Sequence, residues 1–301
     1  MGLGYHYRYF NQSPSDLYMK SGIPDDTPSF SKRISKDETF TEGLIQSLTQ
    51  MEITHLYVLS QERIKFTKSF SHQILTKLQD KNLPLKERVQ ATDLSYGIVS
   101  SMLKKGYLDE ETTQMVQTTS ESILSICSRG DMTSKELVDH LTSLRATNLF
   151  KRVVLITFLT GGAVKKMRSQ IRNVEDYLRK LCYAAMFHDI LLESETQVVI
   201  RSQAQLDRAN YTAEQKELIL EHPKRTYELV KGIKGCPDGA ENIILEHHGD
   251  LTGKNFLMAP NENIGYLSSV FMACEAYADE ILNRSLSNLP ISYEEVVSSL
   301  P

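Results

Sequence analysis

The sequence predicts a mostly α-helical protein, in which a C-terminal helical bundle follows a small N-terminal α+β module. Two patterns support this division. Residues 1–66 contain short runs of β-branched and aromatic residues between turn-forming residues, which is typical of strands. From about Lys68 onwards, apolar residues instead recur at intervals of three and four, which is the spacing of one face of a helix.

The N-terminal module is predicted to hold three strands and one helix. Residues 16–21 and 30–34 are strand-like and flank a segment rich in glycine, proline and aspartate, which indicates a turn. Residues 41–51 carry apolar side chains at helical spacing, and residues 54–59 are a β-rich run that we expect to form the third strand. We expect this module to be regulatory, as a dimer surface or as the docking surface for a signalling protein.

The boundary between the two parts is predicted at residues 127/128, next to a helix stop and a new helix start. Gly130 would end one helix, and Thr133 with Glu136 fits a capping box for the next. The division is therefore a regulatory module over 1–127 and a metal-binding helical domain over 128–301. Within the second part we expect helices over 174–187, 240–248 and 265–282, and one that opens at Thr212 and ends at Pro223.

Charge and composition exclude several classes of protein. The net charge of −4 argues against binding to a nucleic-acid polymer, which requires a basic surface. The four cysteines are widely spaced and form no CxxC pair, so they suit a reducing compartment better than a zinc ribbon or a disulfide framework. The chain has no apolar run of about 18 residues and no signal peptide at its start, so we expect a cytoplasmic protein without a membrane span.

Metal-ligand residues are concentrated in the C-terminal half. Of eight histidines in the chain, four fall in three motifs: His188-Asp189, His222 and His247-His248. Imidazole and carboxylate together suit iron, manganese, zinc or nickel better than calcium or magnesium. Two such ions can activate a water molecule against a phosphodiester. The motifs therefore predict metal-assisted hydrolysis, although His188-Asp189 alone could equally be an ordinary helix-end pair.

These motifs resemble the HD-GYP domains, the metal-dependent bacterial phosphodiesterases of cyclic di-GMP. The resemblance extends from about Thr133 to Leu282. The matching segments are Ala184–Ile190, Tyr211–Pro223, Ile244–His248 and Met272–Tyr277. The resemblance implies a helical-bundle fold, two divalent metal ions (iron, with manganese as the alternative) and cyclic di-GMP or a related nucleotide as the ligand.

The resemblance also implies roles for individual residues. Asp189 would bridge the two ions and, with His188, form the catalytic pair. His188 and Glu275 would complete the site of one ion, and the remaining ligands, His222, His247 and His248, would complete the other. For Glu275 the alternative is a salt bridge with a lysine or arginine, and Asp279, one turn later, is the alternate ligand.

Three basic residues next to these motifs are candidates for contact with a substrate phosphate. They are Lys224, Arg225 and Lys254. The alternative for each is an ordinary solvated charge.

The sequence departs from the family at three places. Leu149 stands where the family has a metal-binding histidine, in a His-x-x-Arg-Val context. Leu192 stands in the place of the lysine that follows HD, and Asn255-Phe256-Leu257 replaces the GYP triplet, so the tyrosine hydroxyl is missing. Two functions stay open: a phosphodiesterase of weak or altered activity, and a catalytically degenerate, metal-containing receptor or adaptor in cyclic di-GMP signalling. A purely structural module would not need to retain the histidines.

Overall fold

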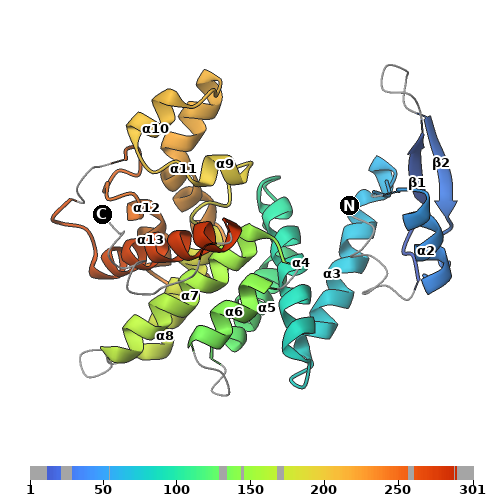
Figure 1. The fold of residues 1–301 in the computed structure, drawn as a ribbon, viewed down its shortest axis with the longest axis horizontal. Helices are drawn as coiled ribbons and strands as arrows, with labels where there is room; N and C mark the ends of the chain where they lie inside the picture. Colours follow the sequence, from blue (N-terminus) through green and yellow to red (C-terminus); the bar gives the residue numbers. More distant parts are fainter. Residues whose placement is uncertain are drawn as a thin grey trace. The chain divides into compact units, whose positions relative to one another are not determined.

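The computed structural model describes residues 12–21, 29–53, 55–128, 134–143, 146–167, 173–256, 261–287 and 289. The chain divides into two compact units, Met1–Leu83 and Pro84–Pro301, and the described part of the second is predominantly helical (Figure 1). No helix within these ranges is long and apolar enough to cross a membrane. All four cysteines are free thiols, as the sequence predicts.

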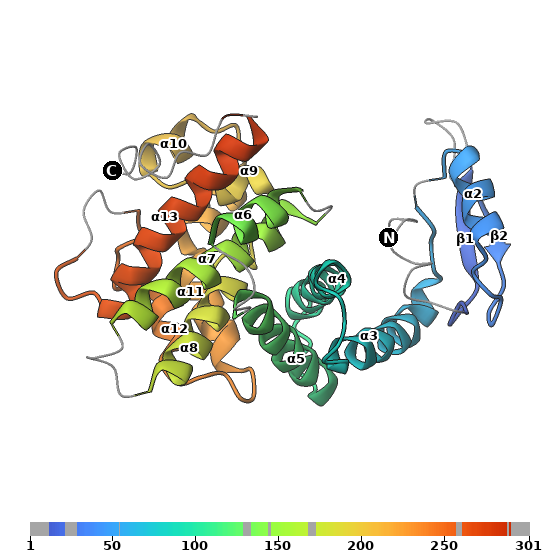
Figure 2. The same cartoon turned by 60° about the horizontal axis from the view of Figure 1, so that its bottom comes forward.

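The smaller unit combines a two-stranded sheet with helices. Strand β1 (Leu17–Ser21) pairs with β2 (Ser29–Ile34) in antiparallel orientation. Helix α2 (Glu42–Gln50) lies beside this sheet in both views, and its first turn is capped by the Thr41 side chain (Figures 1 and 2). The turn η1 (Ser60–Glu62) and helix α3 (Arg63–Gln79) follow. Two of the predicted strands and the predicted helix are thus confirmed.

The third predicted strand is not formed by residues 55–59. Tyr57 makes one isolated bridge to Tyr18, with both backbone N–H···O distances at 2.8 Å. The helical turn η1 begins at Ser60, so the chain leaves the sheet edge soon after Tyr57. Residue 54 lies outside the described residues.

The larger unit is a bundle of helices (Figure 2). They are α4 (Leu85–Leu103), α5 (Glu110–Cys127), α6 (Ser134–Ser143), α7 (Asn148–Lys166), α8 (Val174–Phe187), α9 (Glu195–Val198), α10 (Gln203–Arg208), α11 (Ala213–Lys231), α12 (Ala240–Glu246) and α13 (Tyr266–Leu286). The mostly α-helical fold class, with a helical bundle after a small α+β module, is therefore confirmed.

Helix α7 is central to this bundle, because it packs against α5, α6, α8 and α13. It is apolar around most of its circumference, as expected of a helix covered by neighbours. Its start is fixed by Asp93 of α4, whose carboxylate accepts hydrogen bonds from the backbone N–H of Thr147 (3.1 Å) and from its hydroxyl (2.6 Å). Helices α8 and α12 also pack together, and the residues that follow their C-terminal ends are neighbours: the ring centroids of His188 and His247 are 5.2 Å apart.

The compact units divide at residues 83/84, and the domain boundary predicted at 127/128 stays a prediction. The predicted position lies between α5 and α6, inside the larger unit. The physical reason is that α5 packs against both α7 and α8, so the chain before residue 128 shares their core. Gly130 and Thr133, on which the prediction rested, lie outside the described residues.

Candidate metal centre

The structure brings together all six residues that the sequence predicts as metal ligands. His188 and Asp189 follow the end of α8, and His247 and His248 follow the end of α12. His222 lies within α11 and Glu275 within α13. All six side chains are buried, and they form two groups that share Asp189.

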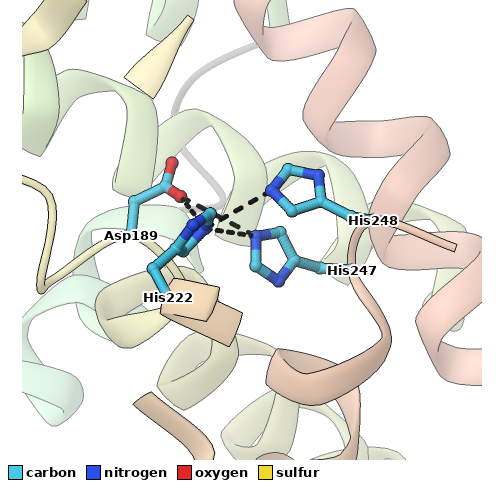
Figure 3. A group of neighbouring side chains, drawn as sticks. All are labelled: Asp189, His222, His247 and His248. Carbon is cyan, nitrogen blue, oxygen red and sulfur yellow. Dashed lines mark hydrogen bonds and ion pairs between the residues drawn. The ribbon is translucent and has the colours of Figure 1, made fainter. Parts of the chain in front are cut away.

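The first group consists of Asp189 and three histidines whose Nε2 atoms converge (Figure 3). The Nε2 atom of His222 lies 3.2 Å from that of His247 and 3.3 Å from that of His248. The Asp189 Oδ1 atom lies 3.1 Å from His222 Nε2 and 3.7 Å from His247 Nε2. Four ligand atoms on three segments of chain thus face one small volume.

The tautomers of two of these rings, His222 and His247, are set by backbone carbonyl groups. His222 Nδ1 lies 2.6 Å from the Ile219 oxygen, and His247 Nδ1 lies 2.6 Å from the Ile244 oxygen. A carbonyl oxygen only accepts, so each Nδ1 carries the proton and donates it. In the neutral ring Nε2 then holds a lone pair, which is the state a metal ligand needs.

Pro223 explains why the Ile219 carbonyl is available. The sequence predicts that Pro223 ends its helix, but α11 continues through it to Lys231. Proline has no N–H, so the bond that residue 223 would make to the carbonyl four residues earlier, that of Ile219, is missing. The Nδ1–H of His222 takes that place. The Ile244 carbonyl belongs to the last turn of α12, where carbonyl groups lack helical partners.

The electrostatics of the first group favour a bound cation. Burial lowers the pKa of His247 and holds that of His248 well below its usual value, so both rings stay neutral and free to bind a metal. The Asp189 Oδ1 atom is buried without a hydrogen bond. Lone pairs held about 3 Å apart repel each other, and a divalent ion among them would satisfy every one. Three imidazoles and a carboxylate fit iron, manganese or zinc.

The second group contains His188, Asp189 and Glu275, and the guanidinium group of Arg152 lies among them. Its Nη1 atom is 2.6 Å from His188 Nε2 and 2.5 Å from Asp189 Oδ2. Its Nη2 atom is 2.5 Å from Glu275 Oε1. The alternative that the sequence leaves open for Glu275, a salt bridge with an arginine, is therefore present.

A second arginine and a third carboxylate complete this network. Arg152 Nε bonds to Asp279 Oδ1 at 2.5 Å, and Arg201 Nη2 lies 2.9 Å from Glu275 Oε1 and 3.1 Å from Asp279 Oδ2. Burial raises the pKa of Asp279 to about 6, against the opposing effect of Arg152. Burial would also raise the pKa of Asp189, but His188 and Arg152 bring it well below its usual value.

Arg201 is a site residue that sequence reasoning missed. It lies in the short connection between α9 and α10, outside every recognised motif, and nothing in its spacing marks it. Arg152 does belong to a motif, Leu149–Val153, but this motif indicates only that a metal-binding histidine is missing and assigns no role to the arginine.

The three predicted substrate-contacting residues lie outside both groups. Lys224 and Lys254 are exposed. Arg225 forms ion pairs with Glu221 (2.9 Å) and Glu217 (3.2 Å) on the surface of α11. Their assignment as phosphate contacts therefore stays a prediction.

At each of the three places where the sequence departs from the HD-GYP family, an apolar side chain packs against other apolar residues. Leu149 and Phe256 pack against a buried cluster that contains Leu192. The Phe256 ring also contacts the ring of His248, with centroids 4.5 Å apart. Leu192, at the position where the resemblance places a lysine, is thus part of the hydrophobic core, and Phe256 packs against His248, a predicted ligand.

Comparison with known proteins addresses the fold. No family model and no curated protein matches the sequence. Among solved structures, one similar chain is Bd1817, a HDG"Y"P protein from Bdellovibrio bacteriovorus, with a TM-score of 0.54 over 98% of this chain and 90% of that chain. The chain has an HD-GYP-type fold. The sequence identity is 14%, so the similarity concerns the fold, and residue roles in this chain rest on its own geometry.

Proposed function

We propose that the protein is a metal-dependent phosphodiesterase of the HD-GYP type that hydrolyses cyclic di-GMP or a related dinucleotide. The observation that carries this proposal is the first group, in which three imidazoles and a carboxylate oxygen without a hydrogen bond converge at about 3 Å. A divalent ion bound there would polarise a phosphoryl oxygen and lower the pKa of a water molecule. Iron is the proposed ion, with manganese as the alternative.

The residues around the first group have complementary roles in this proposal. His222, His247 and His248 hold the ion, and Asp189 joins the two groups through its two oxygen atoms. Arg201 would contact the substrate. Its Nη1 atom is buried and has no hydrogen-bond partner, whereas its side chain as a whole is 27% exposed. An unsatisfied guanidinium N–H at the edge of the centre suits a phosphate oxygen.

A catalytically degenerate receptor or adaptor in cyclic di-GMP signalling is the second candidate. The buried position of Leu192 favours it, because the side chain that replaces the phosphate-binding lysine packs into the apolar cluster. The absence of a hydroxyl group on Phe256 favours it as well. In either function the N-terminal module is the proposed surface for a signalling protein partner.

The test is hydrolysis of cyclic di-GMP by the full chain loaded with Fe²⁺ or Mn²⁺ under low oxygen, followed by chromatography of the linear product. We expect turnover that His222→Ala abolishes and that His140→Ala, on α6 and in neither ligand group, leaves intact. Binding without turnover, measured by calorimetry, would support the receptor. Absence of both would contradict the proposal.

A further inference from the structure

The position that a second metal ion would need is filled by Arg152. The three ligand atoms of the second group lie within 4.8 Å of one another, which is close enough for one ion. Each of them, however, already accepts a hydrogen bond from the Arg152 guanidinium at 2.5–2.6 Å. A metal would bind the same lone pairs at about 2.0–2.2 Å. The guanidinium and the ion therefore cannot be present together.

Arg152 donates nearly all the hydrogen bonds that its guanidinium group can make. A metal ion therefore could not displace it as easily as an exposed side chain. Arg152 is 5% exposed, and its three nitrogen atoms bond to one histidine and three carboxylates. His188 is oriented for this contact, because its Nδ1 atom lies 3.0 Å from the Ala185 carbonyl and its Nε2 lone pair faces Arg152. The carboxylates hold the pKa of Arg152 above its usual range although burial acts in the opposite direction, so the group stays charged.

The second group also offers fewer ligands than an ion needs. Leu149, one helical turn before Arg152 on α7, packs against the apolar cluster of Leu192 and supplies no donor atom. Three protein ligands would remain for the ion. A guanidinium is satisfied by this same set, because its planar fork matches carboxylates.

Most of the negative charge around the second group is compensated without an added ion. Asp189, Glu275 and Asp279 face two guanidinium groups, those of Arg152 and Arg201. A divalent cation placed here would lie within a few ångströms of both arginines in a buried setting, where like charges repel strongly.

We propose that this chain binds a single metal ion, at Asp189, His222, His247 and His248, and that the guanidinium group of Arg152 is a built-in cation in the place of the second. This inference rests on the metal centre of the proposed function and not on turnover. The sequence predicts two metal ions, whereas this inference assigns one metal ion to the first group and the Arg152 guanidinium to the second.

The test is metal content per chain by inductively coupled plasma mass spectrometry, after the full chain is loaded with Mn²⁺ under low oxygen and unbound metal is removed. We expect one equivalent for the native protein and two for the double variant Leu149→His/Arg152→Met, which frees the second group and restores a donor. Arg201→Met is the matched control. It removes a guanidinium from the same carboxylates but not the one bonded to His188, and should stay at one.

Two equivalents in the native protein would overturn the inference and leave the metal-dependent function intact. One equivalent in the double variant would also overturn it. No metal in the native protein would overturn both, whereas one equivalent without hydrolysis would leave the inference and remove the phosphodiesterase. If the double variant fails to fold, electron paramagnetic resonance of the Mn²⁺-loaded native protein decides. An isolated-ion spectrum supports one site, and an exchange-coupled spectrum contradicts it.

Discussion

The Nδ1 atom of His222 lies 2.6 Å from the carbonyl oxygen of Ile219, a group that is available because Pro223 cannot bond to it. A residue that is costly in a helix interior thus orients a ligand. Pro223→Ala would restore an N–H that competes for this carbonyl. We expect the variant to gain stability, by up to about 3 kcal/mol, and to bind metal about 10–100-fold more weakly.

Thermal unfolding of the metal-free protein and a competition titration with a chelator would measure the two effects of Pro223→Ala. Pro84→Ala is the control, because Pro84 precedes α4 and is not part of either ligand group. Unchanged metal affinity in Pro223→Ala would contradict the orienting role.

His248→Ala should weaken metal binding by more than the roughly 10–100-fold typical of supporting residues, because it removes a direct ligand. His140→Ala on α6 should leave affinity unchanged, since His140 lies in neither ligand group. Equal affinities for the two variants, determined by the same chelator competition, would exclude His248 from the centre.

The metal-free protein should lose stability as pH falls through about 6.5, the ordinary pKa of histidine. Burial holds the pKa of His248 well below that value, so below pH 6.5 the unfolded chain binds a proton that the folded chain does not. The contribution of this residue is at most about 1.4 kcal/mol per pH unit.

Urea unfolding of the metal-free protein at pH 7 and pH 5.5 would measure the pH effect. His248→Gln should reduce the difference between the two stabilities, because glutamine takes up no proton in either state. A difference as large as in the native protein would assign the acid sensitivity to other groups.

A fragment of residues 84–301 should fold and bind metal, whereas residues 128–301 should do neither. The shorter fragment lacks α5, which packs on α7 and α8, and lacks Asp93, which accepts hydrogen bonds from Thr147, the N-cap residue of α7. Cooperative melting followed by circular dichroism, together with metal content, compares the two. Cooperative melting of residues 128–301 would show that the boundary at 127/128 is the correct one.

The fold was largely predictable because its helices have clear apolar spacing and its ligand motifs have a familiar order. The ends of α8 and α12 could be placed from His188 and His247 and from the residues around them. Two errors have local causes. Residues 54–59 have strand-forming side chains, but a strand forms only if this segment runs alongside β1 for several residues, and the helical turn at Ser60 prevents that. Pro223 predicts a helix end, because the compensating contact from the His222 side chain is not visible in the sequence.

The residues of the second group could be predicted from the sequence, but not the guanidinium group of Arg152 that lies among them. The family resemblance pairs Glu275 with His188 and indicates a missing histidine at Leu149. The direction in which Arg152 points depends on the packing of α7 against α8 and α13, and Arg201 reaches the same carboxylates from an unmarked loop. Such long-range convergence leaves no periodic signal in one sequence.

Anomalous diffraction at the metal absorption edge, from crystals of the Mn²⁺- or Fe²⁺-loaded protein, tests the centre most directly. We expect one anomalous-difference peak, about 2.0–2.2 Å from the Nε2 atoms of His222, His247 and His248, with the Arg152 guanidinium still bonded to His188. A second peak between His188 and Glu275, with Arg152 displaced, would contradict the single-ion centre. No peak at the three histidines would contradict the metal centre itself.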